Sequence, residues 1–312
     1  MEKGGNMNSM GDNFTIRNFC KDDAYKIGSF DKVAELSYLY KGDMKADNIF
    51  CAVNSENEVL AAADLEPHIS WTSIDKDCQA PDYIYRLNVN IRINPAHDAD
   101  KDLRSRLMDA LLSRAEEIKK DYPGKKIRVI KYIATHNNEE MDFFMSKGFV
   151  AYRTSLVMKR DLIQEIEASS SSSDYTIVNW KLKTDEELNC YVETDAKCNN
   201  GDAWNYDTAA WMRYAPEWAT FAAFSGDKFL GGVMTYLITE ERSATENVFV
   251  LQEWRRKGVA KAFITEALKY LKGKGKTMAT LCVDGDNKPA INLYKSMGYK
   301  IYFVNLEFGY DI

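Results

Sequence analysis

The sequence contains few histidines and no clustered cysteines. Its three histidines, His68, His97 and His136, all lie in the first half and lack the spacing of metal ligands. Its six cysteines are scattered without a Cys-x-x-Cys pair, which argues against a zinc ribbon and against a disulfide framework in a chain of 312 residues. We therefore expect no metal site, and a cytoplasmic protein with reduced thiols.

Long apolar segments and an excess of basic charge are also absent. No apolar run approaches the ~20 residues of a membrane helix, and residues 1–13 lack the apolar segment of a secretory signal. Residues 1–174 carry 24 basic and 29 acidic groups, and residues 175–312 carry 17 and 18, for a net charge of −6. Neither half is a basic domain, so we expect neither a nucleic-acid nor a membrane partner.

The clearest division of the chain is the serine run Ser169–Ser173, which is typical of a flexible linker. The parts of the chain before and after this run begin with similar segments: Phe-Thr-Ile-Arg-Asn-Phe at 14–19 and Tyr-Thr-Ile-Val-Asn-Trp at 175–180. Both alternate apolar and polar residues, as a half-buried strand does. We expect one domain over residues 12–165, a linker over 166–174 and a second domain over 175–312.

Further pairs of matching segments indicate an internal duplication of one α/β domain. Residues 137–149 and 287–299 each predict a short amphipathic helix that ends at a glycine, Gly148 or Gly298, followed by an aromatic residue. Thr184 and Glu187 have the spacing of a capping box, which predicts a helix start there.

One segment of the second half has the features of an anion site. Residues 248–251 predict a short strand, and apolar residues recur at helical spacing from Val259 onward, with Gly258 at the helix entrance. A strand–turn–helix of this kind exposes backbone N–H groups and the positive end of the helix dipole, which suits a phosphate or pyrophosphate. Four basic residues add positive charge: Arg255, Arg256, Lys257 and Lys261.

These residues carry a resemblance to a known family. Arg255-x-x-Gly258-x-Ala260 resembles the acyl-CoA signature Q/R-x-x-G-x-G/A of the GCN5-related N-acetyltransferase (GNAT) family. A second family segment, N-x-x-A-x-x-L-Y-x-x-x-G-F/Y, is matched at every position, by Asn287, Ala290, Leu293, Tyr294, Gly298 and Tyr299. The close match covers about residues 220–300. The resemblance implies two tandem GNAT domains of the α/β class, each with a mixed central sheet and helices on both faces.

The resemblance also implies a cofactor, acetyl-CoA, and roles for individual residues. The strand backbone at Val248, Phe249 and Val250 would pair with the pantetheine arm as a further strand would. Asn287 would contact the same arm, and Tyr294 would lie near the thioester sulfur as the general acid. The pyrophosphate would be held by the amides of Arg255, Arg256, Lys257, Gly258, Val259, Ala260 and Lys261.

The expected reaction is the transfer of acetyl to a primary amine of a small molecule or peptide by direct attack. A free amine has a pKa of about 10.4, so a base must take its proton, and a tyrosine with a pKa near 10 can protonate the leaving thiolate. Glu246 is the first candidate base, and Asp284 is a weaker alternative. Some family members place a glutamate at the position of Cys282, where this sequence has none.

The acceptor is expected to lie near an aromatic-rich segment, residues 201–218. This segment would suit an apolar or cationic amine, or its rings would pack against the neighbouring domain. Its aromatic residues are Trp204, Tyr206, Trp211, Tyr214 and Trp218. The alternative to an enzyme is a non-catalytic acyl-CoA-binding or protein-interaction module with the same fold.

The first half is expected to be a degenerate copy. Residues 94–102, where the signature should lie, contain no glycine, and the acidic residues Asp98, Asp100, Asp102 and Asp109 replace the basic rim and would repel a pyrophosphate. Asn137 is kept, but Phe144 stands at the tyrosine position and cannot donate a proton. We expect this half to keep the fold without binding acyl-CoA, to pack on the active half and to help shape the acceptor pocket.

Overall fold

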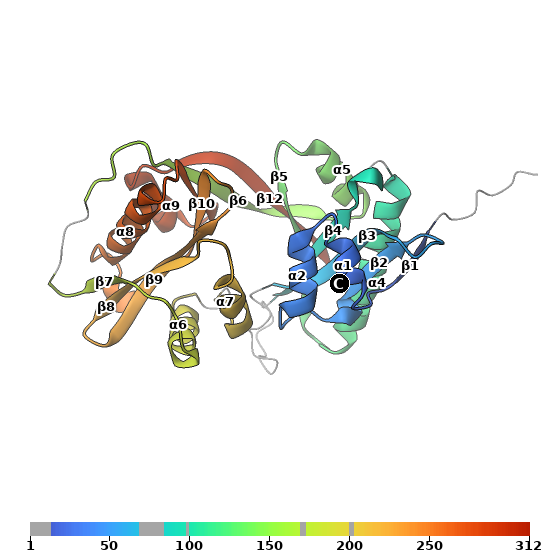
Figure 1. Cartoon of the computed structure of the whole chain (residues 1–312), viewed down its shortest axis with the longest axis horizontal. Coiled ribbons are helices and arrows are strands. Elements are labelled where there is room, and N and C mark those ends of the chain that lie inside the picture. Colours follow the sequence, from blue (N-terminus) through green and yellow to red (C-terminus); the bar gives the residue numbers. More distant parts are fainter. Residues whose placement is uncertain (1–13, 69–83, 98–99, 169–172, 200–202) are drawn as a thin grey trace, which may run out of the picture. The chain divides into compact units, whose positions relative to one another are not determined.

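A computed structural model describes residues 14–68, 84–97, 100–168, 173–199 and 203–312 (Figure 1). Residues Ser169–Ser172 of the predicted linker, together with Cys78 and Asp98, lie outside the described residues. The chain separates into two compact units, one made of residues 1–66, 88–124 and 312 and the other of residues 67–87 and 125–311. No helix among the described residues is long and apolar enough to cross a membrane.

The first unit is built on four strands in the order β1-β2-β3-β4. The side chains of Asp31 and Asp100 cap α2 and α4 by accepting hydrogen bonds from backbone N–H groups of the first turn, which explains where these helices begin. Apolar residues of β2 and β3 pack against α1 and α2. The elements are β1 (Thr15–Asn18), α1 (Asp23–Ile27), α2 (Lys32–Tyr40), β2 (Ile49–Val53), β3 (Val59–Pro67), β4 (Ile84–Ile93) and α4 (Lys101–Lys120).

The second unit contains eight strands among the described residues, in the order β5-β12-β6-β11-β10-β9-β8-β7. The ladders are antiparallel except for the parallel pair β10 and β11, so the sheet is mixed, as predicted. Its strands are β5 (Lys126–Ala134), β6 (Val150–Asp161), β7 (Thr176–Asn179), β8 (Ala219–Ser225), β9 (Lys228–Leu237), β10 (Arg242–Val250), β11 (Met278–Asp284) and β12 (Lys300–Asp311). Its helices are α5 (Asn138–Ser146), α6 (Asp185–Cys198), α7 (Tyr206–Met212), α8 (Val259–Gly273) and α9 (Lys288–Ser296).

Helices cover both faces of this sheet, as the alternation along β8 shows. Phe221 and Ala223 belong to the core cluster that contains residues of α8, whereas Ala222 between them belongs to the cluster of α6. Successive strand residues point to opposite faces, so α8 and α6 lie on opposite sides. The predicted capping box begins α6: Thr184 Oγ1 accepts from the Glu187 N–H at 3.2 Å, and the Glu187 carboxylate accepts from the Thr184 N–H at 3.3 Å.

The two halves of the chain repeat the same succession of elements, from β1 to β6 and from β7 to β12. Asn137 and Asn287 each cap a helix, through side-chain oxygens that accept from N–H groups at 3.2 Å. Gly148 and Gly298 follow those helices with φ angles of 85° and 83°, a conformation that favours glycine. The structure therefore confirms the internal duplication.

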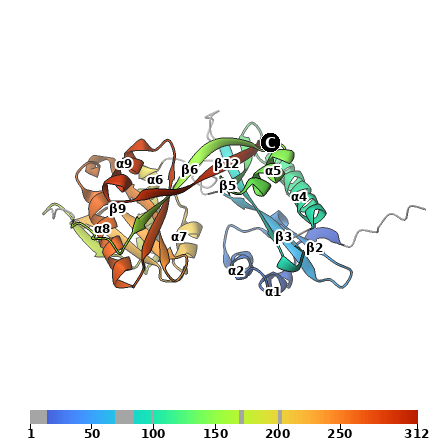
Figure 2. The ribbon, with the colours of Figure 1, turned by 90° about the horizontal axis from the view of Figure 1, so that it is seen from above.

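The two copies exchange their last strands, which the sequence analysis did not anticipate. Strand β6 of the first copy pairs with β11 of the second, and β12 of the second copy pairs with β5 of the first. The registers are equivalent under the duplication, because Met278 faces Asp161 and Arg128 faces Asp311. Strands β6 and β12 also pair with each other, and they run side by side in both views (Figures 1 and 2). The sheet thus crosses the boundary that residues 166–174 mark along the chain.

Candidate active site

The candidate site lies where β10 and β11 separate. Their parallel ladder joins Arg242, Ser243 and Ala244 to residues 278–280 and ends there. Beyond Ala244, the β11-facing edge of β10 has no partner strand among the described residues. An unpaired strand edge offers N–H and C=O groups to an extended ligand, as β-augmentation requires.

A β-bulge interrupts β10 at this point. Glu246 faces Met234 and Phe249 faces Gly232, so the two residues between them on β10, Asn247 and Val248, stand opposite a single residue of β9. Asn247 has a φ of 51°, in the left-handed region. The bulge changes the direction of the strand immediately after Glu246.

The predicted cofactor strand presents its backbone to this opening. Phe249 and Val250 are buried, at 4% and 8% exposure, and belong to different core clusters, while Val248 is half-buried against one of them. Because these side chains serve the core, the backbone is the part of the segment that remains available to a ligand.

Glu246 is partly buried and, within the described chain, makes no hydrogen bond or ion pair. Loss of solvation raises its pKa to about 7. The Glu246 carboxylate affects the pKa values of three neighbours, Tyr236, Cys282 and Tyr294. Burial raises all three pKa values, and the negative charge of Glu246 raises them further. The pKa of the Cys282 thiol reaches about 12. The structure therefore brings together Glu246 of β10, Tyr236 of β9, Cys282 of β11 and Tyr294 of α9. Sequence reasoning missed Tyr236.

Tyr294 is 6% exposed and packs beside Tyr299, with ring centroids 5.8 Å apart. Its hydroxyl makes no hydrogen bond within the part of the chain that the structure describes. Burial, followed by Tyr299 and Glu246, raises the pKa of its phenol. This group is therefore protonated at neutral pH and can donate a proton, and it also packs in the core.

Asp284, the weaker candidate base, is held in an ion pair. Its carboxylate accepts a hydrogen bond from Arg153 Nε at 2.9 Å, and Arg153 belongs to β6 of the first copy. Burial opposes ionisation, but the hydrogen bond and charge of Arg153 prevail and lower the pKa of Asp284. A carboxylate of this kind is a weaker proton acceptor than Glu246.

The turn after β10 has the backbone geometry of an anion site. Gly258 has a φ of 80° and begins α8 without a side-chain cap. A Cβ on Gly258 would have its nearest neighbour, the Tyr175 hydroxyl, at 3.7 Å, so the glycine is needed for its φ angle and not for space. Among the described residues no acceptor is found for the N–H groups of Val259, Ala260 and Lys261, which are free to bind an anion.

The basic side chains around this turn differ in what they do. Arg255 is exposed, but its guanidinium donates to Val250 O at 3.0 Å and to Cys198 O at 3.1 Å, so it ties the end of β10 to the end of α6. Lys257 Nζ lies 4.8 Å from the centre of the Trp254 ring. Arg256 is exposed and has a φ of 61°.

Asn287 lies at the start of α9, where its side-chain oxygen accepts from the Ala290 N–H. Its amide NH₂ makes no hydrogen bond to another described residue, so Asn287 can cap the helix and still donate to a ligand.

The aromatic segment is divided between packing and exposure. Trp204 and Trp218 pack against the α6 cluster, and the Tyr206 hydroxyl donates to Asp185 at 2.7 Å. Tyr214 is 81% exposed. Sequence reasoning also missed Asp195 of α6, a carboxylate with no exposed surface that accepts from the Trp204 N–H at 2.8 Å and from Asn247 Nδ2 at 3.0 Å. No local pattern marks it, because Trp204 and Asn247 lie 9 and 52 residues further along the chain.

The corresponding strands of the first copy lack the bulge. Two backbone hydrogen bonds join β3 and β4: the His68 N–H donates to Arg86 O, and the Asn94 N–H donates to Leu60 O. Both bonds fit the same antiparallel register, so neither strand has an extra residue between them. In that register Asn90 faces Asp64, as Glu246 faces Met234 in the second copy.

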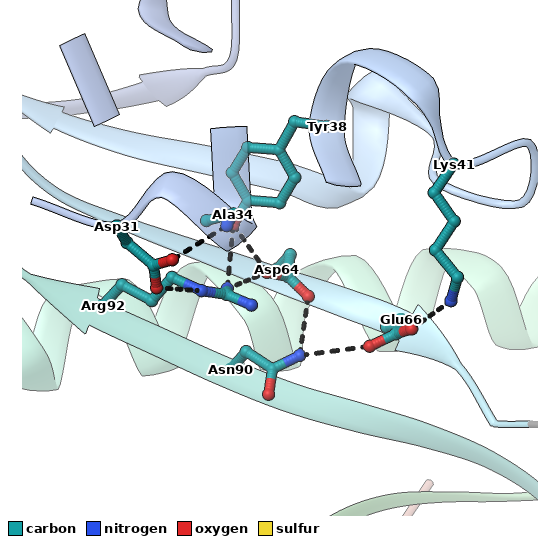
Figure 3. Close-up of polar contacts among 8 residues, drawn as sticks. All are labelled: Asp31, Ala34, Tyr38, Lys41, Asp64, Glu66, Asn90 and Arg92. Carbon is teal, nitrogen blue, oxygen red and sulfur yellow. Dashed lines mark hydrogen bonds and ion pairs between the residues drawn. The ribbon is translucent and has the colours of Figure 1, made fainter. Parts of the chain in front are cut away.

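The same place in the first copy is filled by a network of paired charges (Figure 3). Asn90 donates to Asp64 at 2.9 Å, and Tyr38 donates to the same carboxylate at 2.6 Å. Arg92 pairs with Asp64 and, at 3.0 Å, with Asp31. An amide therefore replaces the glutamate, and the neighbouring carboxylate is already bound by three donors.

Part of the chain is similar to known proteins in sequence. The model of the acetyltransferase (GNAT) family matches residues 181–299. An uncharacterised N-acetyltransferase of Methanocaldococcus jannaschii is 27% identical over 140 residues, which cover 40% of this chain and 61% of that protein.

Solved structures share the fold over nearly the whole chain. A GCN5-related N-acetyltransferase from Sphaerobacter thermophilus has a TM-score of 0.64 at 16% identity, covering 97% of each chain. A tandem GNAT protein from the clavulanic acid biosynthesis pathway has a TM-score of 0.64 at 12% identity, covering 96% of this chain and 98% of the other. The duplicated mixed sheet is thus the two-domain fold of these acyltransferases. Residues 181–299 thus match the acetyltransferase (GNAT) family, and the whole chain shares the fold of these solved structures.

Proposed function

We propose that residues 175–312 transfer acetyl from acetyl-CoA to a primary amine of a small molecule or peptide by direct attack. The observation that carries this proposal is the position of Glu246, which has a pKa of about 7, no partner among the described residues, and a place at the bulge where β10 and β11 part. Acetyl-CoA supplies the activated acyl group as a thioester.

The residues present suit acetyl-CoA. The free N–H groups at the start of α8 and the left-handed Gly258 fit a pyrophosphate. The edge of β10 at Val248–Val250 pairs with no strand among the described residues, although Val250 O accepts from Arg255. This edge fits the amide-containing pantetheine arm, and the Asn287 amide is free to donate to it.

Two groups of the chain would manage the protons. Glu246 accepts a proton from the ammonium group, directly or through a water molecule, and leaves a neutral amine. Tyr294 would donate its phenolic proton to the leaving thiolate, whose conjugate acid has a pKa of about 8.5 by analogy with cysteine. The second proton that the nitrogen loses on becoming an amide would return to the phenolate oxygen of Tyr294. Aromatic residues of the segment 201–218 would favour an apolar or cationic acceptor.

The first copy would bind no acyl-CoA. Its place for a base holds Asn90, its ladder has no bulge, and Arg92 and Tyr38 already occupy the Asp64 carboxylate. Its role would be structural, because its strand β6 completes the sheet beside β11.

Calorimetric titration of acetyl-CoA into the whole chain tests both proposals, followed by a panel of amines. We expect about one site per chain and acetylation of at least one amine. Two sites would contradict the degenerate first copy. Binding without turnover on any amine would favour a non-catalytic acyl-CoA-binding module, and no binding would exclude the proposed function.

A further inference from the structure

The β10 bulge is connected to α6 by a buried carboxylate. Asp195 is fully buried and accepts three hydrogen bonds, from Asn247 Nδ2 at 3.0 Å, Asn199 Nδ2 at 2.7 Å and the Trp204 N–H at 2.8 Å. Asn247 Nδ2 also donates to the Tyr191 hydroxyl at 3.1 Å. One carboxylate therefore joins the end of α6, the bulge and the beginning of the aromatic segment.

This carboxylate has donors but no cation. The described chain contains no ion pair of Asp195, and burial raises its pKa, although the hydrogen bonds from Trp204, Asn247 and Asn199 oppose that rise. A buried carboxylate costs free energy unless its donors remain in place. Asp195 therefore resists movement of the bulge away from α6.

The backbone of the bulge is unusual at one residue. Asn247 is left-handed, a conformation that few residues besides glycine adopt and that asparagine tolerates better than most. The first copy has no net bulge in its β3–β4 ladder, and there Asn90, at the position of Glu246, contacts Asp64 and Glu66 across the strands (Figure 3). The bulge therefore accompanies the contact to α6 and does not follow from the fold alone.

We propose that Asp195 and Asn247 are positioning residues that hold the bulge, and through it set both the direction of Glu246 and the exposed backbone edge of Val248–Val250. The inference rests on the proposed function for its kinetic consequence. Because Asp195 also binds the Trp204 N–H, it couples the cofactor strand to the aromatic segment beside it.

Asp195 and Asn247, with the hydrogen bond between them, are here called the clamp. Hydrogen–deuterium exchange of the whole chain without ligand tests, independently of activity, whether this clamp holds the bulge. Asp195→Asn is nearly isosteric, but its NH₂ group must face one of the three donors. Asn247→Gly keeps the left-handed backbone and removes the side-chain donor. We expect both variants to accelerate exchange in residues 245–250 and 203–206 by at least tenfold, the change for a lost hydrogen bond to a charged group. Exchange unchanged in both segments would overturn the clamp.

Asn57→Gly is the matched control, because Asn57 has a φ of 60° and lies in the β2–β3 turn of the first copy. It should leave exchange in residues 245–250 as in the wild type. If it accelerates exchange there as much as Asn247→Gly does, the effect is a general loss of stability and the clamp is rejected.

Acetyl-CoA binding and the pH profile of kcat/KM then test the positioning role. We expect Asp195→Asn and Asn247→Gly to weaken acetyl-CoA binding about tenfold and to shift the acidic limb that reports Glu246, whose titratable neighbours are Tyr236, Cys282 and Tyr294. If the wild-type chain acetylates amines and both variants keep its affinity for acetyl-CoA and its pH profile, the positioning role alone is overturned. A wild-type chain without acetyl-CoA binding would overturn the proposed function and this kinetic consequence with it, whatever the exchange result.

Discussion

Glu246 lies in an environment unlike that of a surface carboxylate. It lies at the end of a regular ladder, just before the strand changes direction, and lacks a cation or N–H donor within the described residues. A raised carboxyl pKa near neutrality is what a general base for an ammonium substrate requires. Asp284, closer to the family's second segment in sequence, has Arg153 beside it instead.

The Glu246→Gln variant should lose activity but gain stability. We expect wild-type kcat/KM to fall below pH 7 as Glu246 becomes protonated, and the variant to lose about 10²-fold or more in activity together with that acidic limb.

A glutamate ionises near 4.3 in an unfolded chain, so its raised folded-state pKa favours folding at low pH, and this contribution is lost as the pH rises through about 7. Denaturant unfolding at pH 8 should therefore find the variant more stable by about 1 kcal/mol or more, with little difference at pH 4. A variant that keeps the wild-type pH profile contradicts the role of base.

Replacing Tyr294 by phenylalanine should separate chemistry from binding. The ring keeps its packing against Tyr299, while the proton donor is removed. We expect kcat to fall about 10²-fold, with the dissociation constant of acetyl-CoA changed less than about threefold. Tyr302→Phe, at a tyrosine that is 44% exposed on β12, serves as the control and should retain wild-type kcat. Unchanged turnover of Tyr294→Phe would leave that residue a packing role only.

At the scale of elements, the turn from β10 into α8 should be sensitive to one glycine. Glu at position 258 would place a side chain at a φ of 80° and a negative charge where the free N–H groups of α8 point. We expect acetyl-CoA binding to be abolished in calorimetry. Gly275→Ala is the control, since Gly275 follows the other end of α8 with a φ of 79° and equally open surroundings. Its backbone strain should cost stability similarly, about 1 kcal/mol, while binding persists. Retained binding in Gly258→Glu would remove the pyrophosphate from this turn.

Elements determined by neighbouring residues could be predicted from the sequence, and those determined by distant contacts could not. The capping box of Thr184 and Glu187 and the left-handed Gly298 involve residues a few positions apart, so their patterns are visible in the chain. The bulge at Asn247 depends on Asp195, 52 residues earlier. The degenerate first copy, which the acidic residues of 94–102 indicate, stays a prediction. The charge network around Asp64 could not be predicted, because the fold is needed to bring Tyr38 and Arg92 to it.

At the scale of the whole molecule, the exchange of β6 and β12 was beyond prediction for the same reason. Matching segments 150 residues apart indicate a duplication, but they are equally consistent with two self-contained sheets or with exchanged strands. Strand registers are determined by pairing across the sheet, and local sequence carries little information about which copy provides the partner.

The exchange predicts that the second copy is incomplete alone. Residues 173–312 would lack β6, leaving unpaired the β6-facing edges of β11 and β12. We expect this fragment to aggregate or to melt well below the whole chain. Co-expressed with residues 1–168 it should recover both solubility and acetyl-CoA binding, as size-exclusion chromatography and calorimetry would show. A fragment 173–312 that is monomeric, fully stable and binds acetyl-CoA by itself would show that the exchanged strand is dispensable.

The same exchange also governs the order in which the protein can be completed during synthesis. Strand β5 emerges from the ribosome long before its neighbour β12, since Arg128 of β5 pairs with Asp311, the last residue of β12. A chain made from its N-terminus usually finishes one domain before beginning the next. Here the first copy remains one strand short until residues 300–311 have been translated, so nascent chains must keep the edge of β5 from pairing elsewhere while the whole second half is being made.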